Sequence, residues 1–131
     1  MSQPGAKLGD EVVAVDIHVV LVPSPMGPVP TPLPAPFRGR LVESLSATVC
    51  IDGKPAATRG SVALNEPRHV PPGGPFQTPP KNRATVKTAS TSVYIDERPV
   101  ARAGDVVITC NDPADAPQGV ILAEGTVFVG G

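Results

Sequence analysis

The strongest constraint on the fold is a sequence pattern that occurs twice in full and once in part. TVCIDGKPAATRG at 48–60 aligns with SVYIDERPVARAG at 92–104, and TVFVGG at 126–131 repeats the beginning of the pattern. Each full copy has alternating residues that suit a β-strand, then a tight Asp-Gly-Lys-Pro or Asp-Glu-Arg-Pro turn, then a second short strand. The pattern therefore predicts a β-hairpin.

One hairpin alone is marginally stable in water, so the copies are expected to pack on one another. With their flanks the three units span 46–61, 90–105 and 124–131. Packing around one axis predicts a pseudo-threefold β body of the kind that can sit on a trimeric partner. Two sets of equivalent positions are Cys50, Tyr94 and Phe128, and Val49, Val93 and Val127. The apolar partners of Cys50 in the first set favour a core position for it.

Proline and glycine exclude a mainly helical fold. The 131 residues include 18 Pro and 13 Gly, and both residue types interrupt helices. Hydrophobic residues make up 40% of the chain, which favours a folded domain over a disordered one. The length suits one domain, 1–131, with 1–10 as a flexible or docking N-terminus. The predicted fold class is a small all-β domain with long proline-rich loops.

The Val-rich run EVVAVDIHVVLV at 11–22 predicts strands that are buried on much of their surface. It is followed by PVPTPLPAP at 28–36, in which every second residue is proline. In an extended chain these prolines all lose their N–H on the same edge, so the amides between them can still pair on the other edge. The segment is either a stiff edge strand against the domain or a polyproline II linker.

The charge balance and the few aromatic residues argue against a nucleic-acid partner. The formal net charge is −1, and the chain has one Tyr, three Phe and no Trp. Residues 1–10 are not followed by the apolar run of a signal peptide, and 12–22 is too short to cross a bilayer. Cytoplasmic synthesis without a membrane anchor is therefore expected. In that setting Cys50 and Cys110 are expected to be reduced thiols or a metal ligand.

Histidine occurs twice, at His18 in the Val-rich run and at His69 in a second proline-rich segment, 67–80. These two residues and Cys110 lie on three segments far apart in the sequence. Imidazole and thiolate are preferred zinc ligands, and a metal joining the segments would stabilise a loop-rich body. The alternative is that both histidines are hydrogen-bonded structural residues and that Cys110 is a buried free thiol.

The whole pattern resembles the PAAR-repeat family, which is named after a Pro-Ala-Ala-Arg element that follows a strand and a turn. The matching residues are Pro55-Ala56-Ala57-Thr58-Arg59, with an inserted Thr, and Pro99-Val100-Ala101-Arg102, with Val in place of the first Ala. Gly104-Asp105 leading to Cys110 and the terminal TVFVGG extend the similarity. The resemblance covers nearly the full chain from about Val15 onward. VDIHVVLVPSP and PTPLPAPF are similar to segments of a subgroup found with phage-tail-like particles.

The resemblance implies a small conical β protein, not an enzyme, that caps the trimeric β-helical spike of a contractile injection machine. Such machines include type VI secretion systems and phage-tail-like particles. One copy per trimer, of the valine-glycine-repeat or tail-spike kind, would sharpen the tip, help to breach the target envelope and offer a place for effector cargo. The chain, by itself a monomer, would be made in the cytoplasm and delivered on the particle to or into the target cell, with transient membrane contact.

The resemblance also implies one metal ion, usually zinc, near the apex. The residues that match its ligand positions are His18, His69 and Cys110. A third histidine is expected in PTPLPAPF, where this chain has Ala35. A tetrahedral site would then be completed by water or by one of three side chains, Asp16, Asp112 and Cys50.

Two other functions remain open at the level of sequence. An open position on a His/His/Cys zinc ion could activate water in a small zinc hydrolase, although the chain has no HExxH motif. The proline-rich stretch 23–36 could instead be a ligand for the aromatic groove of another protein. No Gly-rich loop ending in Gly-Lys-Ser or Gly-Lys-Thr indicates nucleotide binding.

Overall fold

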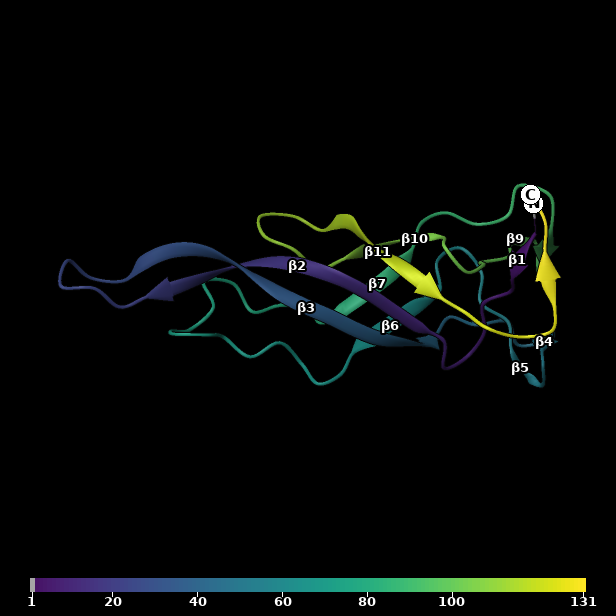
Figure 1. The fold of residues 1–131 in the computed structure, drawn as a ribbon, viewed down its shortest axis with the longest axis horizontal. Helices are drawn as coiled ribbons and strands as arrows, with labels where there is room; N and C mark the ends of the chain where they lie inside the picture. Colours follow the sequence, from purple (N-terminus) through teal and green to yellow (C-terminus); the bar gives the residue numbers. More distant parts are fainter. Residues whose placement is uncertain (1) are drawn as a thin grey trace.

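The computed structural model describes residues 2–131, which form β-strands and loops (Figure 1). The strands are β1 (Gln3–Pro4), β2 (Glu11–Val22), β3 (Val29–Glu43), β4 (Cys50–Ile51), β5 (Lys54–Pro55), β6 (Val62–Asn65), β7 (Arg83–Val86), β8 (Tyr94–Ile95), β9 (Arg98–Pro99), β10 (Val106–Thr109), β11 (Ala116–Leu122) and β12 (Phe128–Val129). No helix occurs in residues 2–131, and so none there is long and apolar enough to span a membrane. The predicted all-β fold class is confirmed.

Six of these strands close into a barrel in the order β10-β11-β2-β3-β6-β7. Each neighbouring pair is antiparallel. Alternating side chains point inward, as the pleat requires, and fill the interior with apolar groups. The largest of these buried side chains are Val12, Phe37, Leu41, Val107 and Ile121.

The hairpin formed by β2 and β3 projects beyond the barrel and forms the narrow end of the molecule (Figure 1). Its strands pair without interruption from Glu11↔Arg40 to Val22↔Val29. The connecting residues 23–28 are called the apex below. This pairing accounts for the length of the molecule, because the barrel itself uses only the first part of β2 and the last part of β3.

The prolines of β3 lie on its outer edge, as predicted. On β2 the N–H of Leu21 donates to a loop carbonyl at 2.8 Å, and the N–H of Val19 donates to the Asp112 carboxylate at 2.8 Å, so both residues face away from β3. Their cross-strand partners, Pro30 and Pro32, therefore also turn their backbone away from β2. The segment is an edge strand and not a polyproline II linker. Its free edge lacks the N–H groups that another strand would need.

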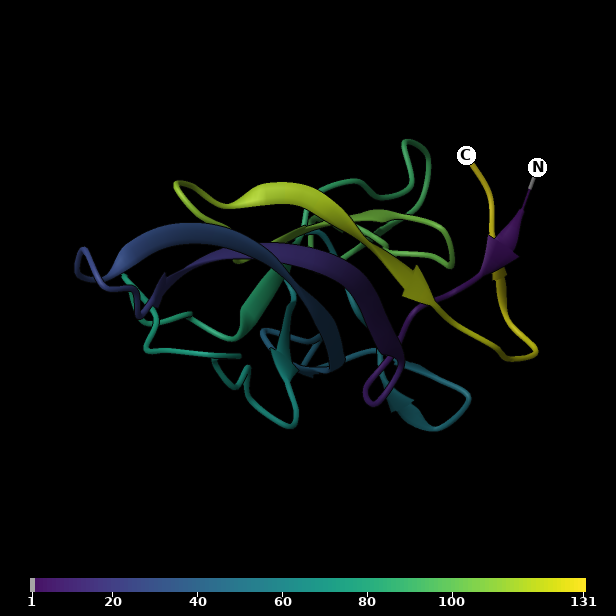
Figure 2. The ribbon, with the colours of Figure 1, turned by 60° about the vertical axis from the view of Figure 1, so that its left-hand side comes forward.

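Three two-stranded ribbons, β4–β5, β8–β9 and β1–β12, form the broad end, called the base (Figures 1 and 2). The first two are the predicted hairpins. The third pairs β12 with Gln3–Pro4, so the N-terminal segment, which sequence analysis left outside the repeats, supplies its second strand. In β4–β5 the turn residues Asp52 and Gly53 have φ of 49° and 79°, the left-handed conformation that a type I′ hairpin turn requires.

A closed ring of backbone hydrogen bonds joins the three ribbons. The Ala6 N–H donates to the Ala101 carbonyl at 2.9 Å, the Ala101 N–H donates to the Ala57 carbonyl at 3.0 Å, and the Ala57 N–H donates to the Ala6 carbonyl at 2.9 Å. All three alanines are fully buried. Each follows one ribbon, so the ring is the pseudo-threefold arrangement that the repeat predicts. Alanine suits this place because a larger side chain would keep the three backbones apart.

The surface of the base corrects one prediction. Cys50 was expected in the core, yet it is exposed, and its equivalents Tyr94 and Phe128 are each 59% exposed. Neighbouring strand residues face opposite sides, and the inward positions are taken by the residues that follow them, Ile51, Ile95 and Val129. The second set of equivalent residues, Val49, Val93 and Val127, is also partly exposed, at 37%, 37% and 41%.

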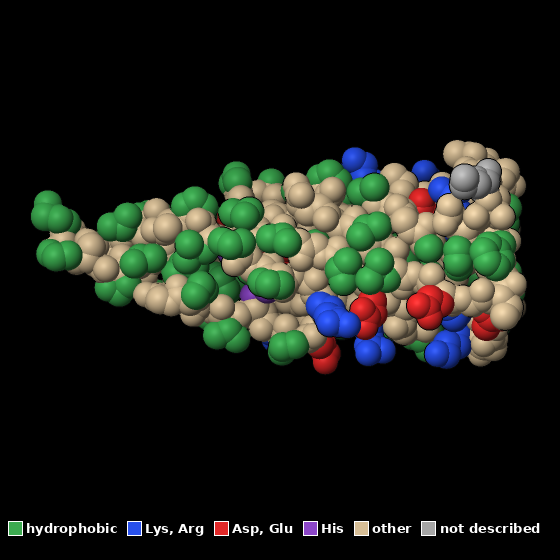
Figure 3. All heavy atoms as spheres, in the orientation of Figure 1, with side chains coloured by type: hydrophobic (Ala, Val, Ile, Leu, Met, Phe, Trp, Pro, Cys, Tyr) green, Lys and Arg blue, Asp and Glu red, His purple; other side chains and the backbone are tan. Residues whose placement is uncertain are grey.

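The molecule tapers from the base to the apex (Figure 3). In this view the Lys, Arg, Asp and Glu side chains gather in the wider half, and hydrophobic side chains cover the narrow half. The sequence explains the contrast, because no Asp, Glu, Lys or Arg lies between Asp16 and Arg38.

Candidate metal centre

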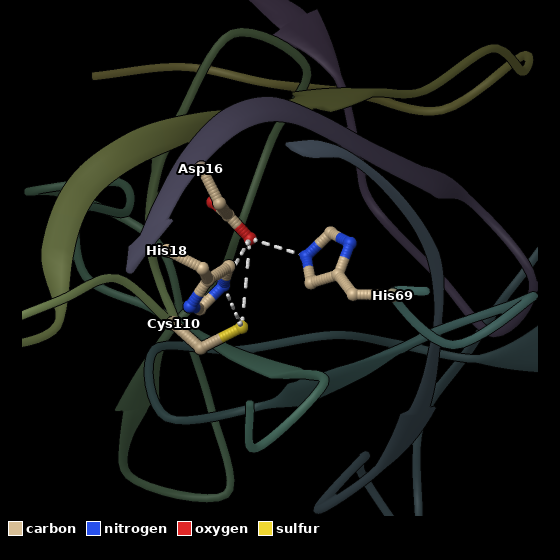
Figure 4. Close-up of side chains that lie close together, drawn as sticks. All are labelled: Asp16, His18, His69 and Cys110. Carbon is tan, nitrogen blue, oxygen red and sulfur yellow. Dashed lines mark hydrogen bonds and ion pairs between the residues drawn. The ribbon is translucent and has the colours of Figure 1, made fainter. Parts of the chain in front are cut away.

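Four side chains from three distant segments meet at the end of the barrel that faces the apex (Figure 4). Asp16 and His18 lie on β2, His69 lies in the loop after β6, and Cys110 directly follows β10. Asp16 and His18 point the same way because strand residues two apart share a face. The structure thus brings together the three predicted residues His18, His69 and Cys110, and it adds Asp16, one of the candidates for a fourth ligand.

The donor atoms are closely spaced around the Asp16 carboxylate. Its Oδ2 lies 3.0 Å from His69 Nε2, 3.5 Å from Cys110 Sγ and 4.0 Å from His18 Nε2. His18 Nε2 and Cys110 Sγ are 3.7 Å apart, and all four donor atoms lie within 4.8 Å of one another. Tetrahedral zinc sets its ligand atoms about 3.3–3.7 Å apart. The four side chains are therefore spaced so that they could hold one metal ion.

Cys110 is a thiol at neutral pH in the metal-free protein. Burial, followed by the negative charge of Asp16, raises the pKa of Cys110 to about 11, although a hydrogen bond from the Asn82 backbone works in the opposite direction. The protonated Sγ donates to Asp16 Oδ2 at 3.5 Å. Thiolate is the form that binds metals, so metal binding must displace this proton.

Two asparagines that sequence analysis did not single out hold His69 in place. The Asn82 side-chain carbonyl accepts the His69 backbone N–H at 2.8 Å and an Asn65 Nδ2–H at 3.0 Å. Asn65 Oδ1 accepts the Arg38 N–H at 2.8 Å, which fixes the amide orientation and directs Nδ2 toward His69 Nδ1 at 3.3 Å. His69 consequently carries its proton on Nε2 and donates it to Asp16. No local sequence signal marks either asparagine.

The position where the resemblance expects a histidine is opposite Asp16. Ala35 on β3 is the cross-strand partner of Asp16 on β2. Directly opposed residues have neighbouring Cβ atoms, so a side chain on either strand can enter the same space. The carboxylate of Asp16 therefore occupies the region that a side chain at position 35 would approach from the neighbouring strand.

The other two side chains predicted as possible fourth ligands, Cys50 and Asp112, are not part of the cluster. Cys50 is a free, exposed thiol at the base, on the side of the barrel opposite the cluster. Asp112 is close to the cluster but behind it, with Oδ2 3.5 Å from His18 Nδ1, the ring nitrogen that faces away from Cys110. Asp112 is therefore a neighbour of a candidate ligand and is not among the four clustered donors.

Aromatic rings and a side opening surround the cluster. Phe76 packs edge-on against His18 with ring centroids 5.8 Å apart, and Phe37 packs edge-on against His69 with ring centroids 6.2 Å apart. A cavity of about 380 Å³, lined partly by residues 78–81 and 110–115, reaches His18 and Cys110 from the surface. The cluster therefore borders the apolar core of the barrel on one side and this cavity, an entry path for an ion, on the other.

The fold and the cluster define a small all-β domain with a buried candidate metal centre. No protein-family model matches the chain, and no curated protein matches its sequence. The resemblance to PAAR-repeat proteins therefore stays a prediction.

Proposed function

We propose that this protein is the tip of a spike in a contractile injection machine, where one copy caps a three-chain shaft and a zinc ion fastens its narrow half. In this role the chain catalyses no reaction. The base binds the shaft, the barrel carries the load, and the β2–β3 hairpin leads into the target envelope.

The observation that carries the proposal is the closed alanine ring at the base. One chain with three near-equivalent ribbons offers a threefold partner the same contact three times. The three valines Val49, Val93 and Val127 have almost equal exposure and supply the apolar contacts, with Tyr94 and Phe128 beside them. A three-chain partner with an apolar end suits this surface because hydrophobic burial does not depend on net charge.

The narrow half suits a segment that meets an envelope first. Between Asp16 and Arg38 the chain carries no Asp, Glu, Lys or Arg, and Met26 at the apex is almost fully exposed. The β2–β3 edges are closed to further strands, by prolines on β3 and by loop contacts on β2. The same pairing weighs against a proline-rich ligand, since its backbone is already engaged with β2.

Zinc is the metal that we assign to the cluster. Two imidazoles, a thiolate and a carboxylate are ligands that zinc accepts in tetrahedral sites. Four protein ligands would leave no position for a water nucleophile, which favours a structural role over the zinc hydrolase alternative. A bound ion would supply a cross-link between β2, the loop after β6 and the end of β10.

The surrounding residues determine which protons must move when the site is loaded. Cys110 must lose its thiol proton. His69 must free Nε2, which now donates to Asp16, so its single ring proton would move to Nδ1, where Asn65 at present offers a donor. Asn65 would have to turn its amide oxygen toward the ring. Loading is therefore expected to release one proton, from Cys110, and to shift the Asn65 side chain.

The proposal is tested by imaging particles from the organism that encodes the chain. We expect one copy at the end of a threefold shaft, seated on its base. A triple variant, Val49→Asp with Val93→Asp and Val127→Asp, should be lost from purified particles, because it places a charge in each of the three contacts.

The matched control is Val15→Asp, which adds one charge at a 59% exposed position on the flank of β2 and should remain on the particle. Finding the wild-type chain only as a free monomer, absent from the particles, would contradict the proposal. Retention of the triple variant at wild-type level would show that the base is not the docking face.

A further inference from the structure

One nitrogen of the candidate metal centre lacks a partner. Nδ1 of His18 is buried and makes no hydrogen bond to any residue that the structure describes. Its nearest charged neighbour is Asp112 Oδ2, at 3.5 Å. A buried polar atom without a hydrogen-bond partner lowers the stability of the folded state. The position of His18 Nδ1 beside a carboxylate therefore needs a physical explanation.

Asp112 is held beside His18 from both directions along β2. Its backbone N–H donates to the Ile17 carbonyl at 2.8 Å, and its Oδ2 accepts the Val19 N–H at 2.8 Å. The two contacts flank His18 in the sequence, so the carboxylate is fixed opposite the imidazole. An ionised carboxylate can only accept hydrogen bonds. The Nδ1 atom that faces it is therefore favoured to carry a hydrogen.

A hydrogen on Nδ1 leaves the lone pair of a neutral imidazole on Nε2, the atom that points at Cys110 and Asp16. The neighbours of His69 favour the opposite tautomer. Its Nδ1 faces a donor, Asn65 Nδ2, so its Nε2 carries the hydrogen. Of the two histidines, His18 alone has the ring nitrogen nearest the cluster ready to bind an ion without moving a proton.

We propose that Asp112 is a positioning residue, which holds His18 as the Nδ1–H tautomer and so makes Nε2 a metal ligand. The inference rests on the proposed metal centre. Asp112 is then not a metal ligand itself, and it acts on the metal site through the ligand His18. A carboxylate that accepts the second ring N–H of a ligating histidine fixes the ring and raises its basicity.

The experiment compares three variants with the wild type by zinc competition against a chromogenic chelator. Asp112→Leu removes the acceptor at similar volume and should weaken zinc binding about 10–100-fold. Asp112→Asn keeps an oxygen in place and should restore most of that loss. Asp115→Leu is the matched control, because it removes another carboxylate of the same loop. The Asp115 carboxylate pairs with Lys81 at 3.0 Å on the exposed surface. Its loss should change the zinc affinity less than about twofold.

A second measurement does not depend on metal. Nitrogen NMR shifts of the metal-free wild type should report the Nδ1–H tautomer for His18 and the Nε2–H tautomer for His69. An Nε2–H tautomer at His18 would overturn the inference, as would equal losses of affinity in Asp112→Leu and Asp115→Leu, or in Asp112→Leu and Asp112→Asn. A wild type that binds no zinc would remove the proposed metal centre, and the tautomer of His18 would then decide by itself whether Asp112 has the assigned effect.

Discussion

The two ends of the barrel are closed in opposite ways. At the base, Ala6, Ala57 and Ala101 meet through backbone hydrogen bonds, and each of the three N–H groups and carbonyls in the ring has its partner. At the apical end the barrel is closed by ionisable side chains, among which the thiol of Cys110 stays protonated and Nδ1 of His18 lacks a hydrogen bond. The base is joined by backbone hydrogen bonds alone, whereas the apical end gathers four donor side chains that could hold a metal ion.

The two ends therefore owe their stability to different interactions. Backbone bonds between small residues need only the chain itself and change little with pH or metal. The stability of a cluster of histidine, cysteine and aspartate depends on protonation, and an ion bound there would contribute folding free energy if its site forms only in the folded state. The following changes test whether the two ends behave independently.

Removal of metal should have the largest effect and should act on the apical end. If zinc is present at a thousand times its Kd, a chelator should lower the free energy of unfolding by about 4 kcal/mol in urea titrations. Amide exchange should become faster first at Val19, next to the cluster, and last at Ala101 in the alanine ring.

The control for metal removal compares the two cysteines. Cys110→Ser should lose the response to the chelator, and Cys50→Ser should keep it, because Cys50 is exposed at the base. A chelator that changes neither the stability nor the exchange of the wild type would show that the apical end, like the base, is complete without an ion.

Alkaline pH should destabilise the metal-free protein through Cys110. Its pKa is raised from 9.0 to about 11 in the folded state, so folding favours the thiol. The contribution is complete below pH 9 and is lost as the pH rises through 11, by about 3 kcal/mol in total. Thiolate absorbance and stability, followed in a Cys50→Ser background, should report both changes.

Cys110→Ser supplies the reference for the other groups that titrate in this range. The pH-dependent loss should be smaller in this variant than in the parent. It should also be smaller in the zinc-loaded parent, whose Cys110 has already lost its proton. Equal losses in all three proteins would assign the effect to other residues.

A larger side chain in the alanine ring should damage the base and leave the metal centre intact. Ala57→Leu adds volume where three backbones meet and should cost about 1–3 kcal/mol of stability. Ala47→Leu, at an exposed position of the same repeat, should stay within about 0.5 kcal/mol of wild type. Zinc affinity should be unchanged in both variants, and a marked loss in Ala57→Leu would show that the two ends are coupled.

The smallest effect is expected for the carboxylates that link one ribbon to the next. Asp96 accepts hydrogen bonds from Ser46 at 2.6 Å and Thr48 at 2.5 Å, and these bonds hold the pKa of Asp96 below its usual value. Asp96→Asn should therefore lower stability slightly at neutral pH. The difference from wild type should vanish as the pH falls through the pKa of the folded state.

Glu97→Gln, at the next position of the same turn, is the control for the removal of charge and should have less effect on stability. Thermal unfolding at pH 7 and in acid would compare the variants. A pH-independent difference for Asp96→Asn would exclude the carboxylate link as its cause.

The fold class and the unpaired edge of the proline-rich segment could be predicted because both follow from local rules, although the choice between an edge strand and a polyproline II linker stayed open. Proline has no N–H wherever it occurs, so its alternation at 28–36 indicated the free edge of β3 before any partner was known. The two complete hairpins were predicted in the same way, from their turn residues.

Sequence analysis missed two features of the base. Strands of two residues are too short for alternation to show which side faces inward, so Cys50 was placed on the wrong side. The second strand of the third ribbon was not predicted, because the two strands of this ribbon come from opposite ends of the chain. A signal was present, since Gln3-Pro4-Gly5-Ala6 aligns with Lys54-Pro55-Ala56-Ala57 when the repeat is continued from the C-terminus to the N-terminus.

Three of the donor residues of the candidate site could be predicted from the sequence, and the fourth could not. His18, His69 and Cys110 stood out as residue types with metal chemistry, but water and three side chains stayed open for the fourth position, with Cys50 the weakest of them. Their roles depend on packing: Asp16 enters the cluster, Asp112 lies behind His18, and Cys50 is at the base.

The sequence by itself determined that this chain forms short β-strands with tight turns and no long helix, since these properties depend on bonds and backbone angles within a few residues. Only the tertiary structure decided that Asp16 joins His69, 53 residues away, and that Gln3 pairs with Val129. Such contacts are set by how the whole chain closes around one core, because the free energy of bringing distant residues together is recovered only when all of the strands pack at once.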